Sequence, residues 1–246
     1  DLKAHYSLED ILHRTVMTFG MAESALSKKI ESWETSLPEY MHLAYLPDPL
    51  KGVRLRLSVY GGNETEKKVL ALNDEVHKLK AILGDSIYAE CDTNLQETVG
   101  RLLRNSEKTL STAESCTGGM ISHLITSVPG SSSYFLGAVT SYANSVKENV
   151  LGVPAEIIEK YGAVSSECVA AMAEGVRKIT GSDYSVATSG IAGPGGGSDE
   201  KPVGLVWIGV ASDKGTETFR LVYKNDRKRN IERFSASALD ILRKKI

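Results

Sequence analysis

Helical and strand patterns alternate from about residue 94 to the end of the sequence, and this alternation limits the possible folds more than any other pattern. Residues 94–104 place apolar side chains at helical spacing, whereas 184–188 and 203–210 are short apolar runs typical of buried strands. Strands that alternate with helices predict a sheet with helices packed on its faces. Another strand pattern, at 216–223, follows so closely that a hairpin, and hence a partly antiparallel sheet, is expected. We therefore predict an α/β sandwich with a mixed sheet for residues 93–246.

Residues 1–92 show a different pattern. Strand patterns lie at 16–19, 53–60 and 87–89, and helical patterns lie at 22–33 and 64–83. In 53–60 every second residue is apolar, which is typical of a strand with one buried face. Pro38, Pro47 and Pro49 interrupt the segment before this strand. A small sheet backed by two helices is the expected assembly, so an α+β domain of residues 1–92 precedes the α/β domain of residues 93–246.

The strand at 53–60 presents Arg54 and Arg56 on its polar face, which raises the question of RNA binding. KH domains bind RNA with a G-x-x-G loop that clamps the nucleotide backbone. The loop here reads Gly61-Gly62-Asn63-Glu64, which lacks the second glycine at that spacing and carries an acid. A formal net charge of -2 also argues against broad electrostatic attraction to nucleic acid. We favour solvated arginines, with RNA binding by the first domain as an alternative.

The composition is that of an ordinary globular protein, with 41% hydrophobic and 24% charged residues among 246. Cys91, Cys116 and Cys168 are scattered and odd in number, so neither a disulfide framework nor a C-x-x-C metal site is expected. No cluster of His, Asp and Glu has the spacing of metal ligands, and no apolar run approaches the length of a membrane span. Without a signal-peptide pattern, a cytoplasmic protein is the expectation. The chain begins at Asp1 rather than Met, as a fragment of a longer protein would.

Residues 112–119 read Thr-Ala-Glu-Ser-Cys-Thr-Gly-Gly and lie between a strand pattern and a helical pattern. Ser115 is therefore expected in a strand-to-helix turn, where a helix N-terminus offers unpaired N–H groups and the positive end of its dipole. Gly118 and Gly119 would let a ligand or a developing oxyanion approach the backbone closely. The alternative is an N-capping cluster whose glycines only permit a tight turn. The spacing leaves both interpretations open.

A serine nucleophile needs a base, because its own hydroxyl is inert. Four of the five histidines lie in the first domain, and the fifth, His123, follows Ser115 by two helical turns and is a poor candidate. Tyr142 ends a strand pattern, and Lys147 lies in the first turn of the next helix. Neighbouring strand ends share one edge of a layered sheet, and a partly buried lysine has a lowered pKa and can act as a base. A solvated Lys147 is the simpler interpretation, and Cys116 is a rival nucleophile.

Residues 188–197 form a second glycine-rich stretch, again directly after a strand pattern. The stretch contains neither G-x-x-x-x-G-K-[ST] nor a G-x-G-x-x-G that runs into a helix, so binding of a nucleoside triphosphate or a dinucleotide is not indicated. Its backbone N–H groups could still hold a phosphate. Arg227, at the start of the last helical pattern, is a cation suited to pair with that phosphate, and a purely structural arginine is the alternative.

Four stretches carry a family resemblance: residues 112–119, Thr140-Ser141-Tyr142-Ala143-Asn144 with Lys147, Gly162-Ala163-Val164-Ser165, and residues 189–204. Together they resemble the competence/damage-inducible CinA family. Residues 94–246 are similar to the family's C-terminal domain, and residues 1–92 resemble its KH-type middle domain. Longer members carry a further N-terminal domain, similar to molybdopterin-binding proteins and linked to ADP-ribose pyrophosphatase activity. That domain has no counterpart in this sequence, so its metal-dependent activity is not expected here.

The resemblance implies an activity that the residues alone do not supply. The C-terminal domain resembles nicotinamide-nucleotide amidase, a hydrolase that converts nicotinamide mononucleotide to nicotinate mononucleotide and ammonia in the recycling of pyridine nucleotides to NAD. It implies no cofactor and no metal, a small-molecule nucleotide substrate, and a cytoplasmic homodimer or larger homo-oligomer without membrane or nucleic-acid partners. The alternative is a catalytically silent nucleotide-binding or regulatory CinA-like protein.

The resemblance also implies roles for the catalytic motif residues. Ser115 would be the nucleophile, Lys147 its base, and Tyr142 would assist proton transfer or orientation. The N–H groups of Gly118 and Gly119 would lie near the oxyanion. Water would then hydrolyse the acyl-enzyme with Lys147 again as the base.

The substrate would be held at the second glycine-rich stretch. The residues implied are Ser189, Gly190, Gly193 and Arg227. One position departs from the family's pattern, because Asn225 stands where a glycine is expected. That departure leaves open whether Arg227 or Arg229 meets the phosphate.

Overall fold

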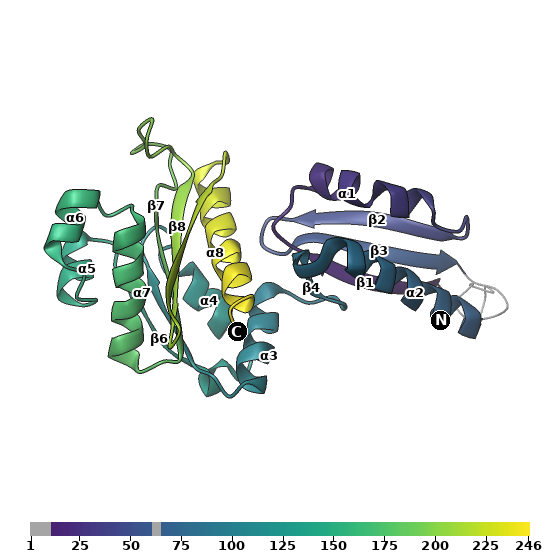
Figure 1. Ribbon diagram of the computed structural model, residues 1–246, viewed down its shortest axis with the longest axis horizontal. Helices are drawn as coiled ribbons and strands as arrows, with labels where there is room; N and C mark the ends of the chain where they lie inside the picture. Colours follow the sequence, from purple (N-terminus) through teal and green to yellow (C-terminus); the bar gives the residue numbers. More distant parts are fainter. Residues whose placement is uncertain (1–10, 61–64) are drawn as a thin grey trace, which may run out of the picture. The chain divides into compact units, whose positions relative to one another are not determined.

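The computed structural model describes residues 11–60 and 65–246. The chain divides into two compact units between Asn94 and Leu95 (Figure 1), and each unit is described by itself. Among the described residues, no helix combines the length and the apolar character needed to cross a membrane.

The first unit is a four-stranded antiparallel sheet with two helices. Its elements are β1 (Ile11–Thr18), α1 (Glu23–Thr35), β2 (Met41–Asp48), β3 (Gly52–Tyr60), α2 (Thr65–Leu83), the 3-10 turn η2 (Gly84–Ser86) and β4 (Ile87–Ala89). The strands lie in the order β2-β3-β1-β4, and every pairing is antiparallel. The small α+β domain predicted for this part of the chain is confirmed.

The apolar face of β3 builds the core of this unit. Alternate residues of β3 are buried against both helices, as the alternation in the sequence predicts. The indole Nε1 of Trp33 in α1 donates a 2.9 Å hydrogen bond to the carboxylate of Glu75 in α2, so the polar atom of this buried ring has a partner. The core consists chiefly of Val53, Leu55, Leu57 and Val59 from β3, Leu26, Ile30 and Trp33 from α1, and Leu72, Val76 and Leu79 from α2.

The strand β2 was not predicted, because its segment carries Pro47. β2 lies at the edge of the sheet and pairs only with β3 among the described strands. A proline lacks the N–H that an interior strand must donate, and it is tolerated where one side of the strand has no neighbour. Pro47 therefore marks the edge of the sheet, whereas Pro38 and Pro49 lie outside β2.

Arg54 and Arg56 lie on the face of β3 opposite the core and are half-buried. Arg54 forms an ion pair with Asp92 of the same unit. The loop Gly61-Gly62-Asn63-Glu64, on which the comparison with RNA-binding loops depends, lies outside the described residues. The charge of Arg54 is thus already paired with a carboxylate of its own unit.

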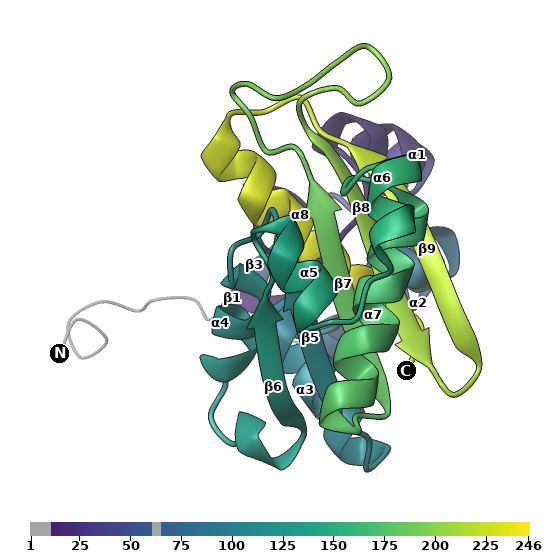
Figure 2. The ribbon, with the colours of Figure 1, turned by 90° about the vertical axis from the view of Figure 1, so that its left-hand side faces the viewer.

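The second unit is a five-stranded mixed sheet between two layers of helices (Figures 1 and 2). The sheet has the order β6-β5-β7-β8-β9. β5 is parallel to β6 and β7, whereas β8 is antiparallel to β7 and β9. The predicted α/β sandwich with a mixed sheet is confirmed. Its elements are α3 (Leu95–Asn105), β5 (Leu110–Glu114), α4 (Met120–Thr126), η3 (Ser131–Ser133), β6 (Phe135–Thr140), α5 (Asn144–Asn149), α6 (Ala155–Tyr161), α7 (Ser166–Thr180), β7 (Tyr184–Gly190), β8 (Leu205–Ser212), β9 (Gly215–Val222) and α8 (Arg227–Arg243).

The two faces of this sheet are covered by different helices. α7 lies on one face, and α3, α4 and α8 lie on the other (Figure 1). Small residues such as Ala113 and Ala187 on the central strands pack against Val169 and Met172 of α7. Because successive side chains of a strand point to opposite faces, Ala113 faces α7 while Glu114 reaches the first turn of α4.

Candidate functional site

The candidate site lies at the edge of the second sheet where three parallel strands end. β5, β6 and β7 run in the same direction, so their carboxyl ends meet at one edge. Ser115 directly follows β5, and its N–H donates a 3.0 Å hydrogen bond to the carbonyl oxygen of Thr188 in β7. The N–H of Ser141, after β6, donates a 2.8 Å hydrogen bond to the carbonyl oxygen of Glu114. These two bonds hold the three strand ends together.

The turn that carries Ser115 is closed by internal hydrogen bonds. Gly118 and Gly119 adopt φ angles of +62° and +98°, which a glycine reaches without strain. The N–H of Gly118 donates to the carbonyl oxygen of Ser115 at 3.2 Å. The N–H of Gly119 donates to the carboxylate of Glu114 at 3.1 Å. The glycines therefore allow the backbone to adopt the conformation of this turn.

These two bonds involve the N–H groups that the sequence predicts as oxyanion donors. The N–H groups of Gly118 and Gly119 already have acceptors inside the turn, so neither is free to meet a ligand. Within the described part of the chain, the N–H groups of Cys116 and Thr117 donate to no other residue. The backbone N–H groups of the turn that have no acceptor in another described residue thus lie one and two residues after Ser115 rather than three and four.

Lys147 in α5 is enclosed by the protein, with 1% of its surface exposed. Its Nζ donates hydrogen bonds to the carbonyl oxygens of Ser141 at 2.8 Å and Tyr142 at 3.3 Å. Burial lowers the pKa of the Lys147 amine from its ordinary 10.5, because desolvation disfavours the charged ammonium. The thiols of Cys116 and Cys168 lie near enough to interact with it electrostatically. The interpretation of Lys147 as a solvated surface lysine is therefore wrong.

Ser115 and Lys147 lie at the same edge of the sheet. Ser115 is half-buried, and among the described residues no hydrogen bond joins its hydroxyl to the Lys147 amine. The neighbouring thiol of Cys116 is buried, and burial raises its pKa to about 12. A thiol with such a pKa stays protonated near neutral pH, so Cys116 is not an activated nucleophile. His123 is exposed on α4.

Arg227 connects the start of α8 to the other parts of the site. One guanidinium nitrogen donates to the carbonyl oxygen of Gly193 at 2.7 Å, and another donates to the hydroxyl of Tyr142 at 3.2 Å. Tyr142 is 64% exposed. Arg229 instead lies 3.8 Å from the exposed carboxylate of Asp226. Of the two arginines that the sequence left open, Arg227 is the one that contacts other candidate site residues.

The second glycine-rich stretch is held by side chains that point away from solvent. The hydroxyl of Ser189 is buried and donates to the carbonyl oxygen of Ala163 at 2.6 Å. A Cβ added at Gly190 would lie 2.4 Å from the carbonyl oxygen of Leu205 and 3.2 Å from the sulfur of Cys116. Gly193 has a φ angle of +91°. Ser189 and Gly190 thus have packing roles, whereas Gly193 meets Arg227 through its carbonyl group.

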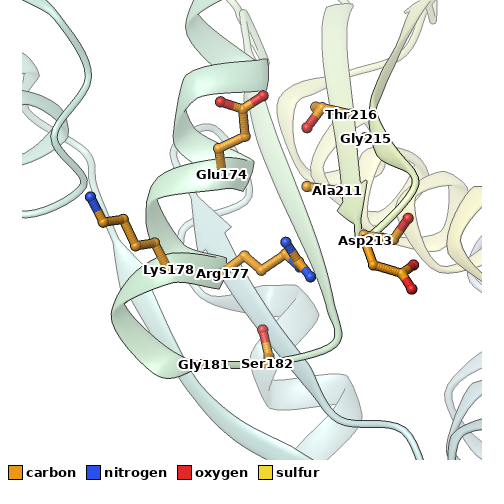
Figure 3. Close-up of a pocket in the computed structure, with 10 residues that line it drawn as sticks. Glu174, Arg177, Lys178, Gly181, Ser182, Ala211, Asp213, Gly215 and Thr216 are labelled. Atoms are coloured by element: carbon orange, nitrogen blue, oxygen red, sulfur yellow. The ribbon is translucent and has the colours of Figure 1, made fainter.

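Two cavities of the second unit lie away from the candidate site. A cavity of 510 Å³ lies between the end of α7 and the β8–β9 turn, where Glu174, Arg177 and Asp213 face it (Figure 3). Ser182, which also lines it, precedes β7, so this cavity is at the opposite end of the strand from Ser189. None of the sequence-predicted site residues lines it. Among the described residues, no group of three His, Cys, Asp or Glu side chains could hold a metal ion.

Comparison with known proteins accounts for both units. The CinA C-terminal domain matches residues 92–246, and the damage-inducible protein CinA KH domain matches residues 13–89. The chain belongs to the CinA family. A CinA-like protein of Cytophaga hutchinsonii is 42% identical over 245 residues, which cover 100% of this chain and 58% of that protein. A CinA-like protein of Flavobacterium psychrophilum is 42% identical with the same coverage of both chains. The chain thus spans little more than half the length of these relatives.

Solved CinA structures match the larger unit. The competence damage-inducible protein A (ComA) of Klebsiella pneumoniae aligns with a TM-score of 0.60 and 34% identity, over 61% of this chain and 94% of that one. A competence/damage inducible protein of Agrobacterium tumefaciens aligns with a TM-score of 0.58 and 34% identity, over 63% of this chain and 97% of that one. The α/β sandwich is therefore the CinA fold.

Two buried polar residues of this CinA domain were not predicted as site residues from the sequence. Glu114 is fully buried behind Ser115, and Asn230 is fully buried in α8. The amide nitrogen of Asn230 donates to the carbonyl oxygens of Ala192 at 3.0 Å and Asn225 at 2.9 Å, which ties the glycine-rich loop to α8. Glu114 stands inside the motif already singled out. In the sequence, each of them is a polar residue at a position that is expected to be buried, and this is the signal that could have identified both.

Proposed function

We propose that this CinA-family chain is a nicotinamide-nucleotide amidase. The observation that carries the proposal is the buried amine of Lys147, held at the same sheet edge as Ser115. A lysine whose pKa is lowered by burial has a larger neutral fraction near neutral pH and can accept a proton. No histidine is needed as a base in such a site.

In the proposed reaction the neutral amine of Lys147 accepts the proton of the Ser115 hydroxyl. The Ser115 oxygen attacks the carboxamide carbon of nicotinamide mononucleotide, and the electron pair of the C=O bond moves to the oxygen. The N–H groups of Cys116 and Thr117 would donate to that oxyanion. When the tetrahedral intermediate collapses, the C–N bond breaks and the leaving nitrogen takes the proton from Lys147 and departs as ammonia.

The second half of the reaction restores the enzyme. Water gives a proton to Lys147 and attacks the ester carbon, and the bond to Ser115 breaks. The Ser115 oxygen takes back the proton, which leaves nicotinate mononucleotide as the product. The same base thus serves both half-reactions, as expected for an acyl-enzyme mechanism.

Arg227 is the group best suited to the phosphate of the substrate. A guanidinium presents several N–H donors in one plane and suits a phosphate. Two contacts position this side chain, one to Gly193 and one to Tyr142. This arrangement favours an anionic ligand between the start of α8 and the glycine-rich loop.

The test is ammonia release from nicotinamide mononucleotide by the parent chain and by Ser115→Ala and Lys147→Ala. We expect the parent to release ammonia and both variants to lose at least about three orders of magnitude in turnover. Ser133→Ala and Lys214→Ala are matched controls, because both side chains are exposed and lie outside the site. Full activity of Ser115→Ala would contradict the mechanism. A parent chain that binds the nucleotide without turnover would favour the silent, nucleotide-binding alternative.

A further inference from the structure

Glu114 is a carboxylate buried without an ion pair among the described residues. It is the last residue of β5, it immediately precedes Ser115, and none of its surface is exposed. Its two oxygens accept four hydrogen bonds from residues that follow it. The donors are the hydroxyl of Thr117 at 2.7 Å and the N–H groups of Gly119, Ile121 and Ser122 at 3.1, 3.0 and 2.8 Å. A buried carboxylate is stable when donors surround it in this way.

The donors explain how the turn around Ser115 holds its shape. The residue before α4 is Gly119, which has no side chain to cap the helix. Glu114 supplies the missing acceptor from the preceding strand, so the helix start is bound directly to the end of β5. Ser115 lies between these two fixed points.

A hydrogen-bond chain extends this constraint to β7. A hydroxyl carries one hydrogen, and Thr117 gives its hydrogen to Glu114, which can only accept when ionised. The hydroxyl of Thr188 lies 2.8 Å from that of Thr117, so Thr188 must be the donor of that bond. The carbonyl group of Thr188 also accepts from the N–H of Ser115. The carboxylate therefore fixes the turn with respect to both β5 and β7.

We propose that Glu114 is a positioning residue for the nucleophile Ser115, an inference that rests on the proposed amidase function. Its carboxylate accepts hydrogen bonds from the N–H groups of Gly119, Ile121 and Ser122, so these groups are not available to a ligand. The N–H groups of Cys116 and Thr117 are left to donate to the oxyanion. The carboxylate faces the α4 side of the sheet and touches no reacting atom. Glu114 affects the rate indirectly, because it fixes the positions of the Ser115 hydroxyl and of the N–H groups of Cys116 and Thr117.

The decisive variant is Glu114→Gln. A glutamine amide group is a donor on one side, so one or more of the four donors loses its acceptor and the turn shifts. Misplacement of a reacting group by about 1 Å lowers rates by roughly a hundredfold. We expect kcat to fall about a hundredfold while KM for nicotinamide mononucleotide changes less than about threefold, because Arg227 is untouched. Glu114→Asp keeps a carboxylate and should recover part of the loss.

A second pair of variants tests the same network without changing the carboxylate. Thr117→Val removes the hydroxyl that donates to Glu114 and accepts from Thr188, whereas Thr117→Ser keeps it. We expect kcat to fall in Thr117→Val and to recover in Thr117→Ser. Asp240→Asn controls for general destabilisation, because Asp240 is a buried carboxylate paired with Arg243 and Lys244 in α8 and lies outside the network.

Each variant is also treated with a fluorophosphonate, and the labelling rate of Ser115 is measured by mass spectrometry. Slow labelling in Glu114→Gln and Thr117→Val, with parental labelling in Asp240→Asn, supports the positioning role. This labelling result would support the positioning role even if the parent chain releases no ammonia. In that case only the proposed substrate would be wrong. Parental labelling and parental kcat in a folded Glu114→Gln variant would overturn the inference.

Discussion

The guanidinium of Arg227 donates a 3.2 Å hydrogen bond to the hydroxyl of Tyr142, although 85 residues separate them in the chain. This bond joins the start of α8 to the segment that follows β6. The same guanidinium reaches the carbonyl oxygen of Gly193 at 2.7 Å. The glycine-rich loop, the segment after β6 and the start of α8 thus meet at the guanidinium of Arg227.

Arg227→Ala should raise KM for nicotinamide mononucleotide by roughly tenfold to a hundredfold, because hydrogen bonds to a charged group contribute about 1.5–3 kcal/mol. The kcat value should change much less, since the base and the nucleophile remain. Arg229→Ala is the matched control, because its side chain is exposed and lies beside Asp226. Steady-state kinetics of both variants measure the difference. Equal KM values in the two variants would remove Arg227 from the phosphate site.

Tyr142→Phe distinguishes orientation from proton transfer. The hydroxyl of Tyr142 contacts Arg227, whereas its carbonyl group accepts from Lys147 and survives the substitution. We therefore expect KM to rise by about threefold to tenfold, as for one lost hydrogen bond at an exposed site, with little change in kcat. A large fall in kcat at constant KM would instead assign Tyr142 to proton transfer.

The pH dependence of kcat/KM should report the Lys147 amine. The base must be neutral in the free enzyme, so kcat/KM should rise with pH and level off above the pKa of Lys147. Because burial lowers that pKa, the rise should be centred below the ordinary value of 10.5. The measurement is a profile from about pH 6 to about pH 10 with the parent chain. A profile that falls over this range would contradict a lysine base.

The same burial should make stability depend on pH. The unfolded chain binds more protons at Lys147 than the folded chain does between the lowered pKa and 10.5, so the free energy of unfolding rises with pH across that window. Lys147→Met lacks this contribution. We expect the variant to melt at a higher temperature than the parent at neutral pH, with the difference shrinking as the pH rises. Thermal unfolding at several pH values tests this, and a pH-independent difference would contradict it.

Gly190→Ala should destabilise the second unit through a direct clash. The new Cβ would lie 2.4 Å from the carbonyl oxygen of Leu205 and 2.9 Å from the Cα of Val206, so β7 and β8 must separate locally. A loss of about 1–3 kcal/mol is typical of such overpacking, which corresponds to roughly 2–4 °C in Tm for each kcal/mol. Gly195→Ala, in the loop that follows β7, is the control, since its Cβ would meet nothing within 4 Å. Similar melting temperatures for the two variants would contradict this packing.

Local patterns were sufficient to predict most of the fold. The alternation of β3, the apolar runs of β7 and β8 and the helical stripe of α3 depend on the period of the backbone, which is a property of neighbouring residues. β2 was the exception, because Pro47 indicates a break unless the strand is known to lie at an edge. Whether a strand has one neighbour or two is decided by distant segments.

Local patterns predict the fold class and the motif that holds Ser115, since strand, turn and helix follow one another within a few residues. Which groups are available for chemistry depends on the packing of the folded chain. Lys147 is buried by the packing of the segment after β6, and the N–H of Gly119 is taken by a carboxylate five residues earlier. Arg227 rather than Arg229 meets Gly193, because residues two positions apart in a helix point to different sides of it. Burial and hydrogen-bond partners depend on how the segments pack in three dimensions, and no local period encodes them.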